Sequence, residues 1–381
     1  MMIEKRGLNK LLQLLEECID IKYCQKVDER YMKSLQYNDV DRPPLVVQAD
    51  FGMTLELPAP WSEFKRYSYS EAFKNPSAMM QNMLLNRVVP GVLLRDDNPL
   101  AIRNDHGTIQ VASILGSKWR MYEDNYPWVD HFDTIEDIQE ILKAKLTEKV
   151  DDKGILPNSI KTLKFYNDKL NAYPNCKKAV QISLPDLQGP IDTAEQLWGS
   201  DIYYAFNENQ DLLKRLLSII VDTMLKVEKV FRKYSYDRLE PDFNTQHGYV
   251  IPGRIMIRND SSIMISPEMY VEFIYPYDEI VLQKVGNGSI HFCGNGQHLI
   301  EKMLGIPYLK GLDFGEPKYM DISYIYALCR EKKVAITNLN PSRSDIISGK
   351  AIKDFPTGVV FVYHTSSFDD AVEVLQRYKE L

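Results

Sequence analysis

Residues 289–316 read SIHFCGNGQHLIEKMLGIPYLKGLDFGE and contain one complete repeat of the fold. The apolar residues at 289–293 and 309–314 predict two buried strands, and residues 297–303 between them predict a short helix. A strand, a helix and a second strand in this order are typical of parallel strands joined by a crossover helix. This stretch therefore predicts an α/β protein with a parallel sheet.

The same alternation continues on both sides of this stretch. No low-complexity linker or charge run interrupts residues 155–381, so we expect no domain boundary there. A first strand is expected at 45–47, and residues 4–36 before it carry leucines at helical spacing. Further helices are expected at 134–149, 211–232, 267–285, 322–332 and 369–380, and further strands at 179–183, 334–336 and 358–363.

The composition excludes several classes of protein. Of the 381 residues, 44% are hydrophobic and 26% are charged, which is ordinary for a globular chain and excludes a disordered or collagen-like one. The 46 Lys and Arg residues against 53 Asp and Glu give a net charge of −7, so no basic excess exists for binding nucleic acid. No apolar stretch has the length of a membrane span, and the N-terminus lacks the apolar core of a secretory signal. We expect a cytoplasmic protein that does not bind membranes.

The five cysteines are odd in number and scattered, unlike a disulfide framework. We expect four of them to be small buried apolar residues, namely Cys18, Cys24, Cys176 and Cys329. Cys293 is the exception, because a histidine lies two positions before it.

His291 and Cys293 share a predicted strand, in which residues two apart point to the same side. One nitrogen and one sulfur ligand side by side suit Zn²⁺. The other interpretation is a core histidine bonded to a carbonyl beside a buried cysteine. If a metal binds here, its third ligand comes from another strand end, where His364 is the best-placed candidate.

Other polar residues lie at the ends of predicted strands, where a barrel would have its active site. Asp313 and Asn338 end strands, Glu316 follows one, and Asp186 and Gln188 lie in a loop bracketed by prolines. Asp260 and its neighbouring serines precede a helix, so helix capping or solvent exposure explains them most simply, and Ser266 is expected to cap the helix that follows it. For His247, loop structure and a pocket wall both remain open. The sequence has no dinucleotide fingerprint, phosphate-binding loop or GxSxG motif.

Several segments together resemble the uroporphyrinogen decarboxylase superfamily. These are LPDLQGPIDTAEQLWG (184–199), DSSIMISPEMYVEFIYPY (260–277), residues 289–316 and Asp41-Arg42-Pro43-Pro44. That superfamily also contains cobalamin-dependent methyltransferases, which move a methyl group from a methylated corrinoid protein to a thiol. The resemblance implies a single (β/α)8 TIM barrel at 41–381, an N-terminal helical extension at 1–40 and a homodimer.

The sequence is closer to the methyltransferase branch than to the true decarboxylases. The methyltransferases bind zinc through a His-x-Cys pair, here His291 and Cys293, and a later cysteine in Gly-Cys-Gly. Here Tyr363-His364-Thr365 occupies that later position. The decarboxylases have a histidine there, lack the His-x-Cys pair, and hold their substrate through an Arg-Gln-Ala-Gly-Arg segment. Residues 47–53 replace that segment without either arginine, which disfavours a substrate with many carboxylates.

The resemblance therefore implies a zinc-dependent methyltransferase that uses methylcobalamin presented by a corrinoid protein. Under this hypothesis the metal ligands are His291, Cys293 and His364, the catalytic or orienting carboxylates are Asp313, Glu316 and Asp186, and the substrate-binding residues are Gln188, His247 and Asn338. One alternative is a metal-free decarboxylase or lyase that acts on a smaller acid, with Asp186 or His364 handling the proton. Another is a non-catalytic, corrinoid-associated barrel.

Overall fold

The computed structural model describes residues 7–49, 53–143 and 149–381. Its main sheet has seven parallel strands in the order β1–β13–β12–β11–β10–β9–β6, and β2 pairs in parallel with β5. Two antiparallel pairs, β3 with β4 and β7 with β8, complete the strands. The strands are β1 Leu45–Gln48, β2 Ala101–Ile102, β3 Trp119–Met121, β4 Pro127–Val129, β5 Gln181–Ile182, β6 Leu187–Gln188, β7 Phe243–Gln246, β8 Tyr249–Pro252, β9 Ile255–Arg258, β10 Gly288–Phe292, β11 Leu309–Phe314, β12 Ala335–Leu339 and β13 Val359–His364.

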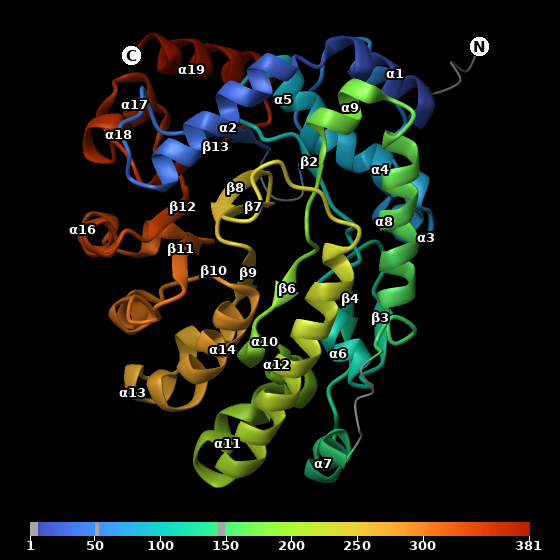
Figure 1. Cartoon of the computed structure of the whole chain (residues 1–381), viewed down its shortest axis with the longest axis vertical. Helices are drawn as coiled ribbons and strands as arrows, with labels where there is room; N and C mark the ends of the chain where they lie inside the picture. The colour runs from blue at the N-terminus through green and yellow to red at the C-terminus, as the bar shows by residue number, and fades with distance from the viewer. Residues whose placement is uncertain (1–6, 50–52, 144–148) are drawn as a thin grey trace.

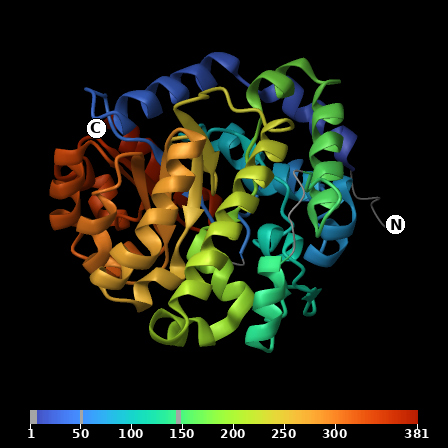
Figure 2. The same ribbon diagram turned by 60° about the horizontal axis from the view of Figure 1, so that its bottom comes forward.

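Helices lie around the outside of these strands (Figure 1), and the turned view shows them surrounding the strands (Figure 2). No helix within the described ranges is both long and apolar enough to cross a membrane. The helices are α1 Leu8–Cys18, α2 Ile21–Leu35, α3 Tyr69–Lys74, α4 Pro76–Met83, α5 Val89–Leu94, α6 Gln110–Ile114, α7 Ile135–Lys143, α8 Leu156–Leu170, α9 Pro174–Ala179, α10 Pro190–Trp198, α11 Ile202–Glu208, α12 Gln210–Arg232, α13 Pro267–Met269, α14 Tyr275–Val285, α15 Ile300–Met303, α16 Ile322–Lys332, α17 Arg343–Ile347, α18 Lys350–Asp354 and α19 Phe368–Glu380.

The β2–β5 pair is connected to both edges of the main sheet. On one side, residues 181–188 run directly from β5 into β6, which pairs with β9. On the other side, the carboxylates of Asp96 and Asp97 accept the β1 backbone N–H groups of Val47 at 2.8 Å and Leu45 at 2.9 Å. The short segment from 98 to 100 then leads into β2. The predicted α/β class with a parallel sheet is therefore confirmed.

The hairpin β7–β8 packs against one face of the main sheet. Alternate residues of a strand point to opposite faces. On β13, Val360 and Val362 pack with the hairpin residues Phe243 and Tyr249, whereas Phe361 belongs to the main core with the outer helices. The face that carries the hairpin is thus the inner one, and Figure 1 shows β7 and β8 at the centre of the molecule.

Several predicted elements agree closely with the structure, and others do not. The strand at 309–314 and the helix at 322–332 have the predicted bounds. Ser266 accepts a hydrogen bond from the backbone N–H of Met269, so its predicted capping role is confirmed. The helix predicted at 134–149 is described as α7, and its residues 144–148 lie outside the described ranges. The predicted division at residue 40 stays a prediction.

The positions expected for Gln188 and Cys18 were wrong. Gln188 belongs to the short strand β6 rather than to a loop, because it pairs with β9. Cys18 is exposed at the C-terminal end of α1, whereas Cys24, Cys176 and Cys329 are buried as expected. The buried side of α1 is occupied by its leucines, which leaves Cys18 on the other side.

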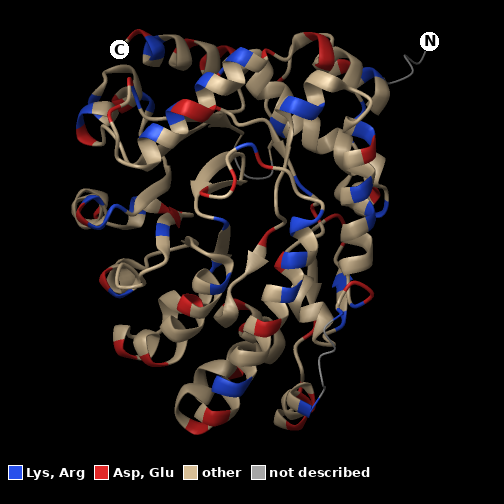
Figure 3. Ribbon diagram, in the orientation of Figure 1, with Lys and Arg blue, Asp and Glu red and all other residues tan. Residues whose placement is uncertain are grey.

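Charged residues of both signs are interspersed along the outer helices (Figure 3). The net charge of −7, from 53 acidic and 46 basic residues, is therefore spread over many elements. A second group of acidic and basic residues lies at the carboxyl ends of the strands, and that group forms the candidate site.

Candidate functional site

The candidate site is a row of polar residues that crosses five neighbouring strands in register. Arg258 on β9 pairs with His291 on β10, and His291 pairs with Asp313 on β11. Gln188 of β6 continues the row beyond Arg258, and Thr337 of β12 continues it beyond Asp313. These positions lie towards the carboxyl ends of parallel strands, where α/β proteins bind ligands.

Asp313 fixes the orientation of His291. Its Oδ1 lies 2.5 Å from Nδ1 of His291, and its Oδ2 accepts the hydroxyls of Tyr249 at 2.8 Å and Thr337 at 2.5 Å. Burial alone would raise the pKa of Asp313, but the nearby imidazole of His247 and the hydrogen bond from His291 bring this pKa well below its usual range. An ionised Asp313 holds the His291 proton on Nδ1, so Nε2 presents a lone pair on the other side of the ring.

Cys293 lies on that other side. Its Sγ is 3.4 Å from Nε2 of His291, so the prediction that the two side chains lie side by side is confirmed. Its backbone N–H donates to Oδ1 of Asp260 at 2.7 Å, and the same oxygen lies 3.7 Å from Nε2 of His291. Burial and the nearby charge of Asp260 raise the pKa of the Cys293 thiol to about 12. A cation is therefore needed to hold Cys293 as a thiolate at neutral pH.

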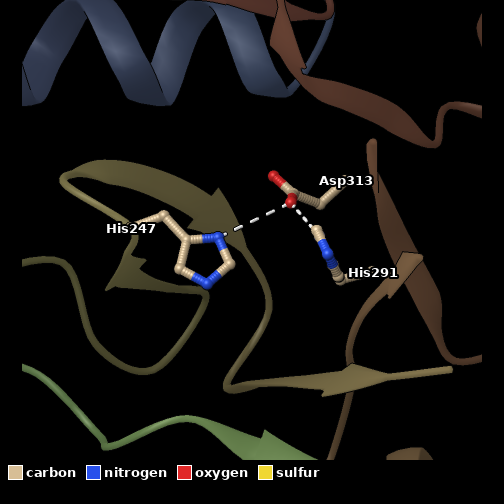
Figure 4. A group of neighbouring side chains, drawn as sticks. All are labelled: His247, His291 and Asp313. Carbon is tan, nitrogen blue, oxygen red and sulfur yellow. Dashed lines mark hydrogen bonds and ion pairs between the residues drawn. The ribbon is translucent and has the colours of Figure 1, made fainter. Parts of the chain in front are cut away.

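Two groups among the described residues bring three candidate metal ligands together, namely Asp260, His291 and Cys293 in one and His247, His291 and Asp313 in the other. Figure 4 shows the second group, in which Asp313 lies between the two imidazoles. The 2.5 Å separation of Asp313 and His291 is a direct hydrogen bond, since two ligands of one zinc ion lie about 3.3–3.6 Å apart. The geometry therefore favours the first group as the metal site, with Asp313 orienting the ligand His291.

Arg258 contacts both imidazoles. Its Nη1 donates to Nε2 of His247 at 3.0 Å, and its Nη2 donates to Nε2 of His291 at 3.1 Å. Its charge adds to burial in lowering the pKa of His291, which keeps this imidazole neutral. A metal ion bound to Nε2 would replace the Arg258 hydrogen bond, because the nitrogen has one lone pair.

His247 occupies the turn of the β7–β8 hairpin and reaches the same group. Gln48 and Arg87 donate to its backbone carbonyl at 2.7 and 3.0 Å. Its ring nitrogens lie 3.3 Å from Asp186 and 3.7 Å from Asp313. Burial lowers the pKa of His247, but the two carboxylates outweigh burial and the net shift is upward.

A cavity of about 460 Å³ adjoins this group, and His247 lines it. The backbone of His247 thus forms a turn while its side chain forms a cavity wall, so both interpretations left open by the sequence apply. The polar lining includes Arg87, Arg103, Asp105 and Tyr126. Arg103 forms ion pairs with Asp186 at 2.5 Å and Asp105 at 3.4 Å, whereas Arg87 has no carboxylate partner among the described residues. His291 and Cys293 do not line the cavity, so His247 is the link between the two.

The remaining predicted site residues occupy different positions around this centre. Glu316 accepts the backbone N–H of Gly294 at 3.0 Å and so supports the turn after Cys293. Asn338 donates to the carbonyl of Phe314 at 2.7 Å. Oε1 of Gln188 is buried without a hydrogen-bond partner among the described residues.

His364 lies at the end of β13, paired in register with Gln48. It is exposed, lines the cavity and belongs to neither group of candidate metal ligands. Two strands, β12 and β11, separate β13 from β10. The structure therefore brings His291 and Cys293 together but does not place His364 with them.

Sequence reasoning missed the roles of Arg258, Tyr249 and Asp260. The N-cap of the short turn Asp260–Met264 is Asn259, so the capping role expected for Asp260 was wrong. The carboxylate of Asp260 instead reaches back to the residue after β10. The sequence did carry one signal for Asp260, because the segment 260–277, which begins with it, resembles the uroporphyrinogen decarboxylase superfamily.

These residues define an α/β protein with a cluster of candidate metal ligands at the carboxyl ends of parallel strands. No protein family model matches the sequence. No curated protein matches it either. The fold is similar to the solved structure of a methyltransferase from Methanosarcina mazei, with a TM-score of 0.65 and 15% sequence identity over 93% of this chain and 98% of that chain. At this identity the similarity concerns the fold alone.

Proposed function

We propose that this protein is a zinc-dependent methyltransferase that moves a methyl group from a methylated corrinoid protein to a thiol or related acceptor. The observation that carries the proposal is the 3.4 Å separation of His291 Nε2 and Cys293 Sγ, with Asp313 bonded to the opposite ring nitrogen. Similarity of the fold to a methyltransferase supports it. The corrinoid donor and the thiol acceptor rest on the resemblance of the sequence to cobalamin-dependent methyltransferases.

The donor atoms fit zinc. Zinc binds nitrogen at about 2.0–2.1 Å and sulfur at about 2.3 Å, so two such ligands of a tetrahedral ion lie about 3.5 Å apart. The 3.4 Å between Nε2 and Sγ matches this separation. The carboxylate of Asp260, 3.7 Å from Nε2 of His291, adds a negative charge beside these two donor atoms, which favours a cation.

The chain's own residues would prepare the site for methyl transfer. Bound zinc would favour the thiolate form of an acceptor thiol at neutral pH. Asp313 keeps the His291 proton on Nδ1, away from the metal side. In the cavity, Arg87 forms no ion pair with a described carboxylate, so an acceptor with an oxyanion group would be oriented there.

We also infer that the strands close as a (β/α)8 barrel. In this barrel the seven-stranded sheet would supply most of the ring, and the β2–β5 pair would join its two edges. The continuity of 181–188 and the Asp96 and Asp97 hydrogen bonds to β1 support closure at the two joints.

Zinc content and methyl transfer test this proposal. We expect about one zinc ion per chain in the wild type, loss of zinc in Cys293→Ser, and retention in Cys18→Ser, since Cys18 is exposed and remote from the site. With free methylcobalamin as donor, the wild type should methylate 3-mercaptopropionate faster than the uncharged 3-mercapto-1-propanol. Protein without stoichiometric zinc, or unchanged zinc in Cys293→Ser, would contradict the proposal.

A decarboxylase on a smaller acid is the second candidate, because Asp186 lies beside the arginine-lined cavity. Burial would raise the pKa of Asp186, but Arg103 and His247 bring it well below its usual range. An ionised Asp186 cannot donate the proton that decarboxylation requires, which makes this candidate weaker. Decarboxylation of a small acid that survives exhaustive chelation would favour it.

A further inference from the structure

We propose that Asp260, rather than His364, is the third protein ligand of the metal, and that Asp192 is the positioning residue that holds Asp260 in place. This inference rests on the zinc site proposed above.

Asp260 has the position that a third ligand requires. Its Oδ1 lies 3.7 Å from Nε2 of His291, within a few tenths of an ångström of the separation expected for two zinc ligands. The same oxygen accepts the backbone N–H of Cys293 at 2.7 Å. Asp260 lies two residues after the end of β9, and β9 is the neighbour of β10, which carries His291. His364 would have to reach across two strands.

Helix capping does not account for the orientation of Asp260. Asn259 is the N-cap of the turn Asp260–Met264, and the Asp260 carboxylate points back to the adjoining strand end. The side chain is half-buried, with 35% of its surface exposed, so an ion can reach it. The carboxylate of Asp260 and a thiolate at Cys293 would repel each other unless a cation lay between them.

Asp192 fixes the backbone at this point. It is buried on α10, and its two carboxylate oxygens accept the N–H groups of Asp260 at 2.9 Å and Ser261 at 2.8 Å. Two N–H groups held by one carboxylate leave the backbone at 260–261 little freedom. The fold thus holds Asp260 rigidly in an orientation that a metal would stabilise.

Metal binding in Asp260→Asn and His364→Ala tests the ligand assignment. Asparagine keeps the shape of the side chain and an acceptor for the Cys293 N–H, so a purely structural role of Asp260 would survive. We expect zinc affinity, measured by competition with a chromophoric chelator, to fall at least about tenfold in Asp260→Asn and to stay unchanged in His364→Ala. With Co²⁺ in place of zinc, the visible bands should shift in Asp260→Asn only.

The outcomes separate the two proposals. A wild-type protein that binds no zinc contradicts the proposed function. A wild type that binds zinc while Asp260→Asn binds it equally well contradicts only the present inference, and loss of zinc in His364→Ala with retention in Asp260→Asn would restore His364 as the ligand.

A double-mutant cycle tests the positioning role of Asp192. Asp192→Asn should weaken zinc binding in the wild-type background but have little effect when Asp260 is already asparagine, because Asp192 acts on the metal only through the Asp260 carboxylate that it positions. Circular dichroism would check folding, and Asp192→Glu, which keeps the charge but moves the carboxylate, would replace Asp192→Asn if that variant does not fold. Equal losses in both backgrounds would contradict the positioning role.

Discussion

Asp313 is the residue on which the orientation of the whole site depends. It is fully buried, and its carboxylate accepts hydrogen bonds from an imidazole, a phenol and an alcohol. Each of these donors favours the ionised carboxylate, and the ionised carboxylate in turn selects the tautomer of His291 that can bind a metal through Nε2. The negative charge of Asp313 therefore determines that the lone pair of His291 lies on Nε2.

Replacing Asp313 by asparagine should uncouple this arrangement. The amide is neutral and offers one acceptor oxygen, so His291 would no longer be held with its proton on Nδ1. We expect zinc affinity to fall about 10- to 100-fold, the usual effect of removing a group that orients a metal-bound histidine. Chelator competition measures the loss.

Thr337→Val is the matched control for this change. It removes one donor to Asp313 and leaves the carboxylate and its bond to His291 in place. Its zinc affinity should change less than that of Asp313→Asn. Wild-type zinc affinity in Asp313→Asn would show that the tautomer of His291 does not control metal binding.

At the scale of elements, the β7–β8 hairpin carries His247 into the site through its two-residue turn. Both turn residues have positive φ, 51° at His247 and 93° at Gly248, as a tight hairpin turn requires. A Cβ at Gly248 would lie 2.9 Å from the Gln48 amide and 3.0 Å from the Arg87 guanidinium. The position of the turn thus depends on Gly248, whereas the group that the turn brings into the site is the imidazole of His247.

Two substitutions should separate these roles. His247→Asn should fold with nearly wild-type stability, because asparagine tolerates positive φ, yet lose most methyl-transfer activity. Gly248→Ala should lose about 1–3 kcal/mol of unfolding free energy, because alanine is strained there and crowds Gln48 and Arg87. Urea denaturation and the transfer assay measure both effects. Full activity in His247→Asn would remove His247 from the site.

Whether an element could be predicted from the sequence depended on how its residues are buried. The β11 strand and the α16 helix have local apolar patterns, and their bounds were predicted correctly. The hairpin at 243–252 was missed because all eight of its strand residues are buried, so no polar alternation marks it. The sequence predicted capping for Asp260 because its actual partner is not local. That partner, the backbone N–H of Cys293, lies 33 residues later, just after β10. Local spacing identified His291 and Cys293, but the register across strands that adds Arg258 depends on tertiary pairing.

At the scale of the whole molecule, buried carboxylates divide into two kinds. Asp186 and Asp313 face cationic or hydrogen-bonding partners that hold their pKa values well below the usual range. Among the described residues, Asp278 accepts hydrogen bonds from the Asn259 amide at 2.6 Å and the Tyr270 hydroxyl at 2.9 Å. Burial outweighs both contacts and raises the pKa of Asp278 to about 7. The first kind stabilises the fold when ionised, and the second destabilises it.

Asp278 should therefore make the protein less stable as the pH rises. In the unfolded chain an aspartate has a pKa near 3.9, so between about pH 4 and pH 7 the folded state binds more protons than the unfolded state, and stability falls across this window. Asp186 and Asp313 act in the opposite direction and mainly below about pH 4. Asp278→Asn keeps an acceptor for Tyr270 and Asn259 but cannot ionise. We expect the loss of unfolding free energy between pH 4.5 and pH 7.5 to be smaller in this variant by about 2–4 kcal/mol.

Urea denaturation of chelator-treated protein at several pH values measures this difference and keeps metal binding out of the comparison. Asp201→Asn, at an exposed position, is the control and should follow the wild-type curve. Each variant is compared with the wild type at the same pH. Contributions of His247 and His291 to the pH dependence of the unfolding free energy therefore cancel in the difference, provided that the site is unchanged. Parallel curves for Asp278→Asn and the wild type would mean that Asp278 is ionised throughout, and that its two hydrogen bonds compensate fully for burial.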